Sequence, residues 1–436
     1  MLSVDLPEVT NEIIKDLISE HKSEKLPRYS EMLRYYKSKH KILERVPKDP
    51  SKPNHKLVND YPGYIVDTIQ GYFIGIPVQY SSGDEKLLDD LKNIFDANNE
   101  EDHNAELAKY MGILGEAFEL LYIDENSEIR FVRLKNEETI VVFDTDFQKS
   151  IQMALRYYYL TDKSTKKKIL KVELYYSDRV EYYTGNDSGY TLDESRPHYF
   201  GKVPIIYYNN NEECIGDFEK VMRLIDDYDR RVSDNSNELE EFRNAYLKLK
   251  NMSGTDAEDL KEMKRMGAVK VEGDGDAGFI EKTVDDAYTE HHIERLDNNI
   301  HKFSKVPNLS DENFAGNLSG VAIKFKLWPI EQVAACKERK FKSGLKRRIK
   351  LIANILAIKG KNYDWKSVNI KFKRNIPSNM LESSQVAMNV NGIVSQETLL
   401  SILPFVDDPA DEIDKIQAEQ DDVSLYKNLD KVNINE

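Results

Sequence analysis

Two groups of polar side chains have the types and spacing that could bind a metal. Asp226, Asp227 and Asp229 form an acidic cluster, and His291 and His292 are adjacent. Helical spacing and exposure to solvent explain the acids without a metal. Adjacent histidines on a helix point in different directions, so a shared ion is not expected there. The sequence predicts no metal site in either place.

The other motifs that carry chemistry are missing. GDGDAG at 273–278 resembles a calcium loop but lacks the closing glutamate of that loop, so it predicts a turn. There is no GxxxxGK[ST], HExxH, CxxC or GxSxG pattern. Carboxylate pairs are so common in this chain that they do not by themselves indicate acid–base catalysis. We therefore expect a protein that is not an enzyme and that needs no cofactor.

Composition limits the class of protein. The chain has 436 residues, enough for about two to four domains. Its net charge is −15, with 62 basic and 77 acidic residues. This argues against tight binding of nucleic acid through phosphate neutralisation, but it allows DNA to slide past. Cys214 and Cys336 are the only cysteines, which indicates a reducing compartment. No membrane span or secretion signal is expected.

The stretch around which the chain is organised is Gly216–Leu249. Its apolar residues recur every three or four positions, with Asn235 in one slot. The pattern predicts one helix of about 34 residues, on the order of 50 Å long. The helix predicted at Asp286–Ser304 continues this step, so we expect the two to pair antiparallel. The expected packing residues are Phe218, Val221, Ile225, Tyr228, Val232, Leu239, Phe242, Ile293, Leu296, Ile300 and Phe303. A core helix or coiled-coil arm is the simpler interpretation.

The segment between these helices is small and acidic. The runs GAVKVEG and GFIEKTV predict two strands around a turn at Asp274–Ala277, which is a hairpin. With so few core residues, this segment is expected to need neighbouring subunits for stability.

The region Met1–Cys214 predicts helices followed by a sheet. Glu8–Glu24 and Tyr29–Leu43 have helical periodicity and are separated by Pro27. From Gly115 the period changes to two, and the runs predict an antiparallel meander of about five or six strands. The fold class is therefore α+β, with a multi-domain arrangement.

The C-terminal part returns mainly to helix. Lys305–Gly320 is predicted to be a loop, and the helix that follows contains Pro329, which should kink it. Beyond it, Tyr363–Glu436 contains an extended piece, two or three short helices and an acidic tail. Lys337–Lys350 is strongly basic. It is either a solvated helix face or a contact with DNA or with an acidic neighbour. This basic patch comprises Arg339, Lys340, Lys346, Arg347, Arg348 and Lys350.

Three stretches together resemble the portal proteins (head-tail connectors) of long-tailed double-stranded-DNA phages. The first is NHKLVNDYPGYIVDTIQGYFIGIPVQY, with GEAFELLYID after it. The second is GKVPIIYYNNNEECIGDFEKVMRLIDDYDRRVSDNSNELEEFRNAYL. The third is FAGNLSGVAIKFKLWPIEQVAACKERKFKSGLKRRI. Their order and spacing match that family across Tyr29–Leu356.

The resemblance implies a dodecameric ring at a capsid vertex of the virion, assembled in the host cytoplasm. Its channel carries double-stranded DNA during packaging and ejection. In that plan each part of the chain has a name: 1–214 is the wing, 215–251 and 286–304 are the stem helices, 252–285 is the clip, 305–320 is the tunnel loop, 321–362 is the kinked helix that connects wing and crown, and 363–436 is the crown with its acidic tail.

The resemblance also implies partners and a DNA-facing loop. The large terminase docks at the clip and is later replaced by head-completion or adaptor proteins, while major capsid and scaffold proteins face the wing. No residue from Val306 to Val321 is cationic, so we expect weak contact with DNA. The expected DNA-facing residues are Asn308, Asp311, Glu312, Asn313, Phe314, Asn317 and Ser319. The alternative is a non-ring coiled-coil scaffold protein without a DNA channel.

Overall fold

The structure is a computed structural model, and its description is limited to part of the chain. It describes residues 2–3, 9–47, 49–50, 52–161, 163, 166–186, 189–242, 246–251, 256–267, 271, 273–280, 286–309, 320–376, 380–403, 405–406, 409 and 411–420. The chain divides into two compact units, Met1–Arg374 and Asn375–Glu436. Each unit is described by itself.

The N-terminal helices form one continuous run. α1 (Asn11–Glu20) passes into a π-helical turn at His21–Lys25, and α2 (Leu26–Tyr36) follows directly. The predicted break at Pro27 is wrong. The wider spacing of the π-helical turn, in which Leu26 N–H bonds to the carbonyl oxygen of His21, lets the helical run continue past Pro27, which has no N–H. A 3-10 turn at Lys41–Glu44 comes next.

The larger sheet of the first unit has six strands in the order β1-β5-β6-β7-β8-β9. All neighbouring strands are antiparallel except β1 and β5. α1 covers one face, where Ile14, Leu17 and Ile18 pack on Leu155 and Val172. The strands are β1 (Leu2–Ser3), β5 (Thr139–Phe143), β6 (Ile151–Thr161), β7 (Lys168–Tyr175), β8 (Arg179–Asn186) and β9 (Gly189–Pro197).

A second sheet takes the first two strands of the predicted meander. Its order is β10-β3-β4, with β3 (Glu116–Ile123), β4 (Ile129–Leu134) and β10 (Ile205–Asn209). The prediction of a single meander is therefore wrong. Six successive residues at the start of β3 are buried, so both faces of this strand are covered. Its second neighbour in the sheet is β10. Period-two patterning identifies a strand but not the strand beside it.

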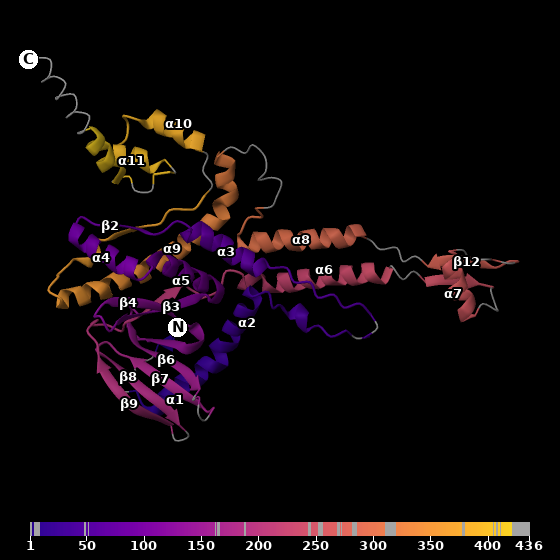
Figure 1. Ribbon diagram of the computed structural model, residues 1–436, viewed down its shortest axis with the longest axis horizontal. Coiled ribbons are helices and arrows are strands. Elements are labelled where there is room, and N and C mark those ends of the chain that lie inside the picture. Colours follow the sequence, from indigo (N-terminus) through magenta and orange to yellow (C-terminus); the bar gives the residue numbers. More distant parts are fainter. Residues whose placement is uncertain are drawn as a thin grey trace, which may run out of the picture. The chain divides into compact units, whose positions relative to one another are not determined.

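Helices surround the smaller sheet. They are α3 (Tyr61–Ile74), α4 (Glu85–Ala97), α5 (Glu100–Leu114) and the long α9 (Gly320–Ile358). The rings of Phe73 in α3 and Phe341 in α9 are fully buried and meet edge to face at 5.7 Å between centroids. Pro329 lies inside α9, and Figure 1 draws this helix with a change of direction along its length. A short pair, β2 (Gln79–Ser81) and β13 (Asn369–Lys371), completes the unit.

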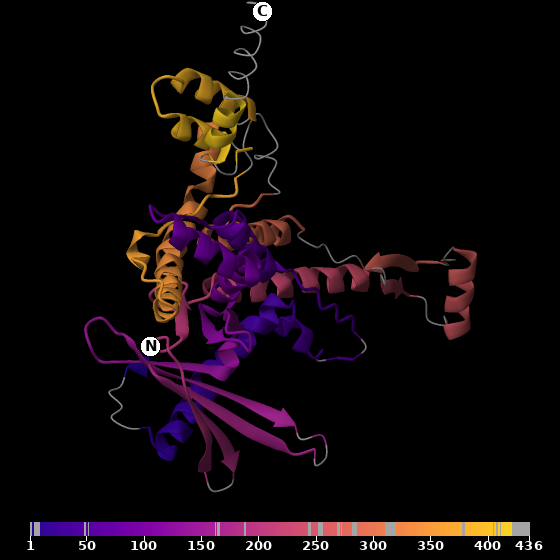
Figure 2. The ribbon, with the colours of Figure 1, turned by 60° about the vertical axis from the view of Figure 1, so that its left-hand side comes forward.

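The chain leaves this core through α6 (Met222–Phe242) and returns through α8 (Asp286–Ser304). The two helices pack together and run side by side in both views (Figures 1 and 2). The predicted single helix at Gly216–Leu249 is wrong at both ends. A 3-10 turn, Glu219–Val221, precedes α6, and Tyr246–Lys250 forms strand β11. The sequence YLKLK alternates with period two, and its backbone pairs with a distant strand instead of continuing the helix.

That distant strand is β12 (Asp276–Ile280), which pairs antiparallel with β11. The described turn residues are Gly273 and Asp274, and β12 begins at Asp276, so the turn predicted at Asp274–Ala277 is confirmed only at its first residue. Most of the predicted partner strand GAVKVEG lies outside the described residues. α7 (Ala257–Met266) lies between β11 and β12, with Asp256 as its capping residue. The second unit contains α10 (Met380–Val390), α11 (Gln396–Ser401) and a helical stretch at 411–420.

Candidate functional site: the helix pair and its anchors

The residues predicted to join the two helices are buried to different degrees. Tyr228 and Val232 of α6 and Ile293 of α8 are half-buried. Leu239 is 59% exposed and Phe303 is 54% exposed, and the side chain of Phe242 lies outside the described residues. The fully buried members are Phe218, Val221, Ile225, Leu296 and Ile300. A single subunit therefore covers only part of the predicted apolar seam.

A second set of contacts, formed by hydrogen bonds, links α6 to the N-terminal region. The irregular segment 54–59, which we call the strap, lies along α6. Every second amide of the strap donates to every fourth side chain of one α6 stripe. Four residues of a helix advance about 6 Å and two residues of an extended chain about 6.6 Å, so the two spacings match. The hydrogen bonds are His55 N to Asn237 Oδ1 (2.6 Å), Leu57 N to Ser233 Oγ (3.0 Å) and Asn59 N to Asp229 Oδ1 (2.9 Å).

Asp229 of this stripe is fully buried and has a second partner besides the strap. Its side chain and that of His40 are both fully buried, with His40 Nδ1 2.6 Å from Asp229 Oδ2. The other ring nitrogen of His40 lies 3.2 Å from the carbonyl oxygen of Tyr35. The prediction that Asp229 is a solvated acid is wrong, because residues 189 positions away cover it. Asp226, in contrast, is partly exposed and accepts from the hydroxyl of Tyr35.

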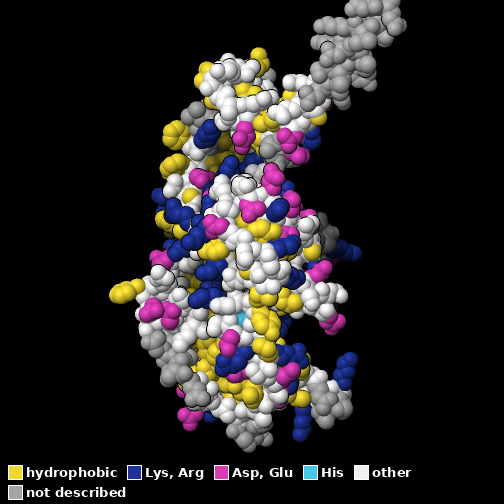
Figure 3. Space-filling view, turned by 90° about the vertical axis from the view of Figure 1, so that its left-hand side faces the viewer, with side chains coloured by type: hydrophobic (Ala, Val, Ile, Leu, Met, Phe, Trp, Pro, Cys, Tyr) yellow, Lys and Arg dark blue, Asp and Glu magenta, His cyan; other side chains and the backbone are white. Residues whose placement is uncertain are grey.

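The predicted basic patch is not one surface. Arg348 is completely buried, so its assignment to a basic face is wrong. Arg339 and Lys346 are exposed, whereas Lys340 pairs with Glu212 at 2.5 Å. The remaining members are Arg347, which donates to the carbonyl oxygen of Val203 at 3.0 Å, and Lys350, which lies over the ring of Trp365. Figure 3 shows Lys and Arg side chains interspersed with Asp and Glu on the face that includes the end of α9.

Arg348 holds a buried ionic cluster between α9, α5 and β3. Its guanidinium lies 2.8 Å from Glu119 and 3.1 Å from Glu100, and it donates to Asn104 at 2.9 Å. Burial alone would raise the pKa of Glu119, but the Arg348 charge and the hydrogen bond from His103 lower it to about 2. Helical periodicity does not distinguish such a buried arginine from its exposed neighbours.

Most of the predicted tunnel loop lies outside the described residues. This holds for Asp311, Glu312, Asn313, Phe314, Asn317 and Ser319. Asn308 is half-buried, at the end of a short anchored stretch. There the hydroxyl of Tyr64 donates to the carbonyl oxygen of Pro307 at 2.8 Å and accepts from Leu309 N at 3.0 Å. The loop therefore starts from a point fixed against α3.

The other candidate groups do not converge. His292 faces Asp227 at 3.4 Å, while His291 is exposed and faces Glu294 at 3.7 Å. Within the described part of the chain, no group of three or more His, Cys, Asp or Glu side chains is placed to hold a metal ion. Among the same residues, no helix has the length and apolar character to cross a membrane.

The chain has several small antiparallel sheets and a projecting helix pair, and it is similar to structural proteins of phage particles. The profile of a family of phage portal proteins matches residues 15–424. The chain belongs to this family, which is described as "Phage portal protein, SPP1 Gp6-like". Portal proteins are structural components of the bacteriophage virion and are not enzymes.

Two relatives are similar over nearly their whole length. The portal protein of Bacillus phage SPP1 is 29% identical over 450 residues, covering 95% of this chain and 87% of the relative. The portal protein of Clostridium phage phiCD119 is 26% identical over 429 residues, covering 92% and 94%. Among solved structures, a chain from "Neck of empty GTA particle computed with C6 symmetry" is 12% identical with a TM-score of 0.47, covering 79% of this chain and 90% of that one.

Proposed function

We propose that this protein forms a ring at one vertex of a phage capsid. The resemblance to the portal family implies that the ring is a dodecamer. Double-stranded DNA is packaged and later ejected through its channel. The family match across residues 15–424 carries this proposal. The exposed parts of the helix seam, Leu239 and Phe303, support it, because apolar surface left open in one subunit is available to its neighbours in a ring.

The parts of the chain take the roles that the family plan assigns. Residues 1–214 form the wing, which faces capsid and scaffold proteins. Residues 215–251 and 286–304 form the stem, 252–285 the clip, 305–320 the tunnel loop, 321–362 the connecting helix, and 363–436 the crown. Among the described side chains of the two-stranded sheet of β11 and β12, none is buried, which suits a clip completed by neighbours. The large terminase and then head-completion proteins dock there.

Of the two stem helices, we assign the channel wall to α8. α6 is covered by α8 along one side and by the strap along another. α8 keeps an exposed stripe at three- and four-residue steps, formed by Tyr288, His291, Arg295, Asn298 and Lys302. A cysteine at Asn298 should be protected from a thiol reagent in DNA-filled capsids and accessible in empty ones, whereas a cysteine at Arg230 of α6 should react equally in both. Protection at Arg230 alone would reverse the assignment.

Electron microscopy of negatively stained, purified protein tests the ring directly. We expect rings with a central hole, and light scattering should give the mass of many subunits. A population that is monomeric or dimeric at all concentrations, as expected for a coiled-coil scaffold protein, would contradict the proposal.

The tunnel loop is proposed to contact DNA weakly and without reading its sequence. An acidic chain (net charge −15) and a loop that carries no cation after Lys305 neutralise few phosphates. Filter binding of the rings to DNA at low salt should give weak retention. Tight retention that is lost on deleting residues 308–317 would overturn this part of the proposal.

A further inference from the structure

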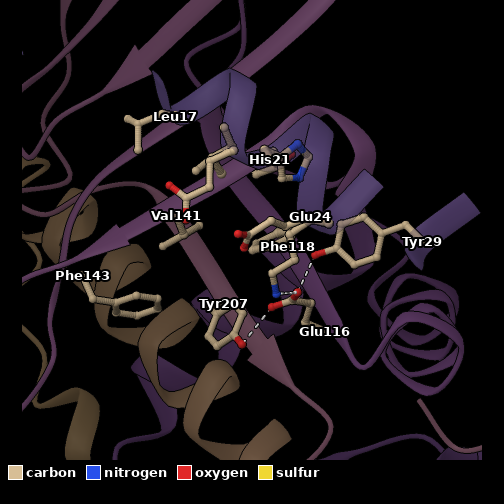
Figure 4. A pocket seen from close by; sticks show the side chains of 13 residues that line it. Leu17, His21, Glu24, Tyr29, Glu116, Phe118, Val141, Phe143 and Tyr207 are labelled. Carbon is tan, nitrogen blue, oxygen red and sulfur yellow. Dashed lines mark hydrogen bonds and ion pairs between the residues drawn. The ribbon is translucent and has the colours of Figure 1, made fainter. Parts of the chain in front are cut away.

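A cavity of about 200 Å³ opens between the first helices and the two sheets (Figure 4). One wall is apolar and is formed by Leu17, Ile140, Val141 and Phe143. The lining also includes residues of the π-helical turn His21–Lys25. π-helical turns are rare and often occur at functional sites, because the extra residue redirects side chains that a regular helix would place elsewhere.

The floor of the cavity is a carboxylate that is already neutralised. Glu116 is nearly buried, and its Oε1 lies 2.8 Å from Lys25 Nζ. The hydroxyl of Tyr207 donates to Oε2 at 3.0 Å, and the hydroxyl of Tyr29 donates to Oε1. Burial would raise the pKa of Glu116, but the Lys25 charge and the hydrogen bonds from Lys25, Tyr29 and Tyr207 together lower this pKa. Glu116 and Lys25 therefore form an ion pair without net charge.

The rim carries two further carboxylates. Glu20 and Glu24 are exposed and line the cavity, and Figure 4 shows the Glu24 side chain directed into it. Within the described residues, no hydrogen bond or ion pair satisfies either carboxylate. His21 does not offset their charge, because burial lowers its pKa to about 4 and keeps the imidazole neutral near pH 7. The open cavity is therefore an apolar slot beneath two unpaired negative charges.

The dimensions and chemistry of this slot define what fits. Small-molecule sites usually enclose about 300–1,000 Å³, so about 200 Å³ suits a single side chain better than a cofactor. An arginine matches both the apolar wall and the rim. Its aliphatic stem can lie on Leu17 and Val141 while its guanidinium reaches Glu20 and Glu24. Arginine is also among the residues that most often anchor protein interfaces.

We propose that this cavity is an anchor site for an arginine side chain of a shell or scaffold protein that docks on the wing. The proposal rests on the proposed function, which places residues 1–214 against those partners. It assigns a specific attachment point on the wing, near the junction of α1 and α2.

The test uses full-length protein and two matched probes. N-acetyl-arginine amide carries the guanidinium, and N-acetyl-citrulline amide is its neutral isostere. Saturation-transfer NMR should show the arginine probe binding at least about fivefold more tightly than the citrulline probe, because each exposed ion pair contributes modestly. The double variant Glu20→Gln/Glu24→Gln should lose this preference.

The control variant is Glu12→Gln/Asp16→Asn, which removes two exposed carboxylates at the same spacing on α1 but away from the cavity. It should retain the preference for arginine. Equal binding of the two probes, or an unchanged preference in Glu20→Gln/Glu24→Gln, would overturn the anchor site. Ring formation is measured on the same samples: rings that show no arginine preference reject the anchor alone, whereas absence of rings rejects the proposed function.

Discussion

His40 and Asp229 form a hydrogen-bonded pair, with Nδ1 2.6 Å from Oδ2, in a place that solvent does not reach. The other ring nitrogen of His40, Nε2, lies 3.2 Å from the carbonyl oxygen of Tyr35. The pair links the segment after α2 to the middle of α6. The helix that the proposal places in the stem is thus held to the rest of the subunit by a buried polar contact as well as by apolar packing.

Replacing His40 tests the strength of this link. His40→Ala leaves the Asp229 carboxylate buried without its main partner, which should lower the free energy of unfolding by about 3 kcal/mol. Thermal and urea unfolding at a fixed protein concentration measure the change. The control His291→Ala removes a side chain that is 76% exposed, and it should stay within about 0.5 kcal/mol of the unmodified protein. Similar stabilities for the two variants would show that the buried pair is not important.

The strap makes a separate prediction. Ser233→Ala removes the acceptor of the Leu57 amide and should cost about 1 kcal/mol. Hydrogen–deuterium exchange of the amides at 55–59 should become faster. Ser236→Ala is the matched control, because that hydroxyl donates to the carbonyl oxygen of Val232 within α6. If the amides at 55–59 exchange equally fast in both variants, the hydrogen bonds between the strap and α6 do not order the strap.

Two glycines should respond in opposite directions to the same substitution. A Cβ at Gly344 of α9 would lie 2.1 Å from the ring of Tyr208, which is fully buried. Gly344→Ala should therefore destabilise the protein by about 1–3 kcal/mol. A Cβ at Gly71 of α3 would meet nothing within 4 Å, so Gly71→Ala should stabilise by about 0.4–1 kcal/mol. Thermal unfolding distinguishes the two, and a loss at Gly71 comparable to that at Gly344 would refute the packing argument.

The cluster around Arg348 predicts a dependence on pH. The pKa of Glu119 is lowered from 4.5 to about 2 in the folded chain. A lowered carboxyl pKa contributes stability that is complete above pH 4.5 and is lost as the pH falls toward 2, by about 1.4 kcal/mol per pH unit. The stability advantage of the unmodified protein over Glu119→Gln should thus shrink between pH 5 and pH 3. Unfolding by urea at each pH measures it, and a constant difference would contradict the ion pair.

The exposed part of the helix seam predicts an effect on assembly. Leu239→Ser should change the stability of the isolated subunit by less than about 0.5 kcal/mol, because Leu239 is 59% exposed. In the proposed ring it should weaken assembly, which sedimentation velocity measures as a lower ring fraction. Val221→Ser is the contrast, since Val221 is fully buried and its loss should destabilise the subunit itself. Normal ring assembly by Leu239→Ser would mean that this position faces solvent.

The candidate site was predicted from sequence only where its signal is local. The three-four step of apolar residues predicted α6 and α8, and the structure shows them packed together. The same pattern continued into Tyr246–Lys250, which is compatible with either a helix or a strand, and there it predicted the wrong element. The basic run at 337–350 looked uniform, yet it contains both exposed Lys346 and buried Arg348.

The amino-acid order by itself determined the α+β class, the helix pair and the resemblance to portal proteins. These depend on periodicity and motifs within short stretches, which neighbouring residues impose on one another. Only the tertiary structure decided that β3 pairs with β10, that His40 covers Asp229 and that Arg348 meets Glu100 across 248 positions. Partners so distant in the chain are selected by the packing of the whole core, because burying a charge is tolerated only where another element brings its counter-charge.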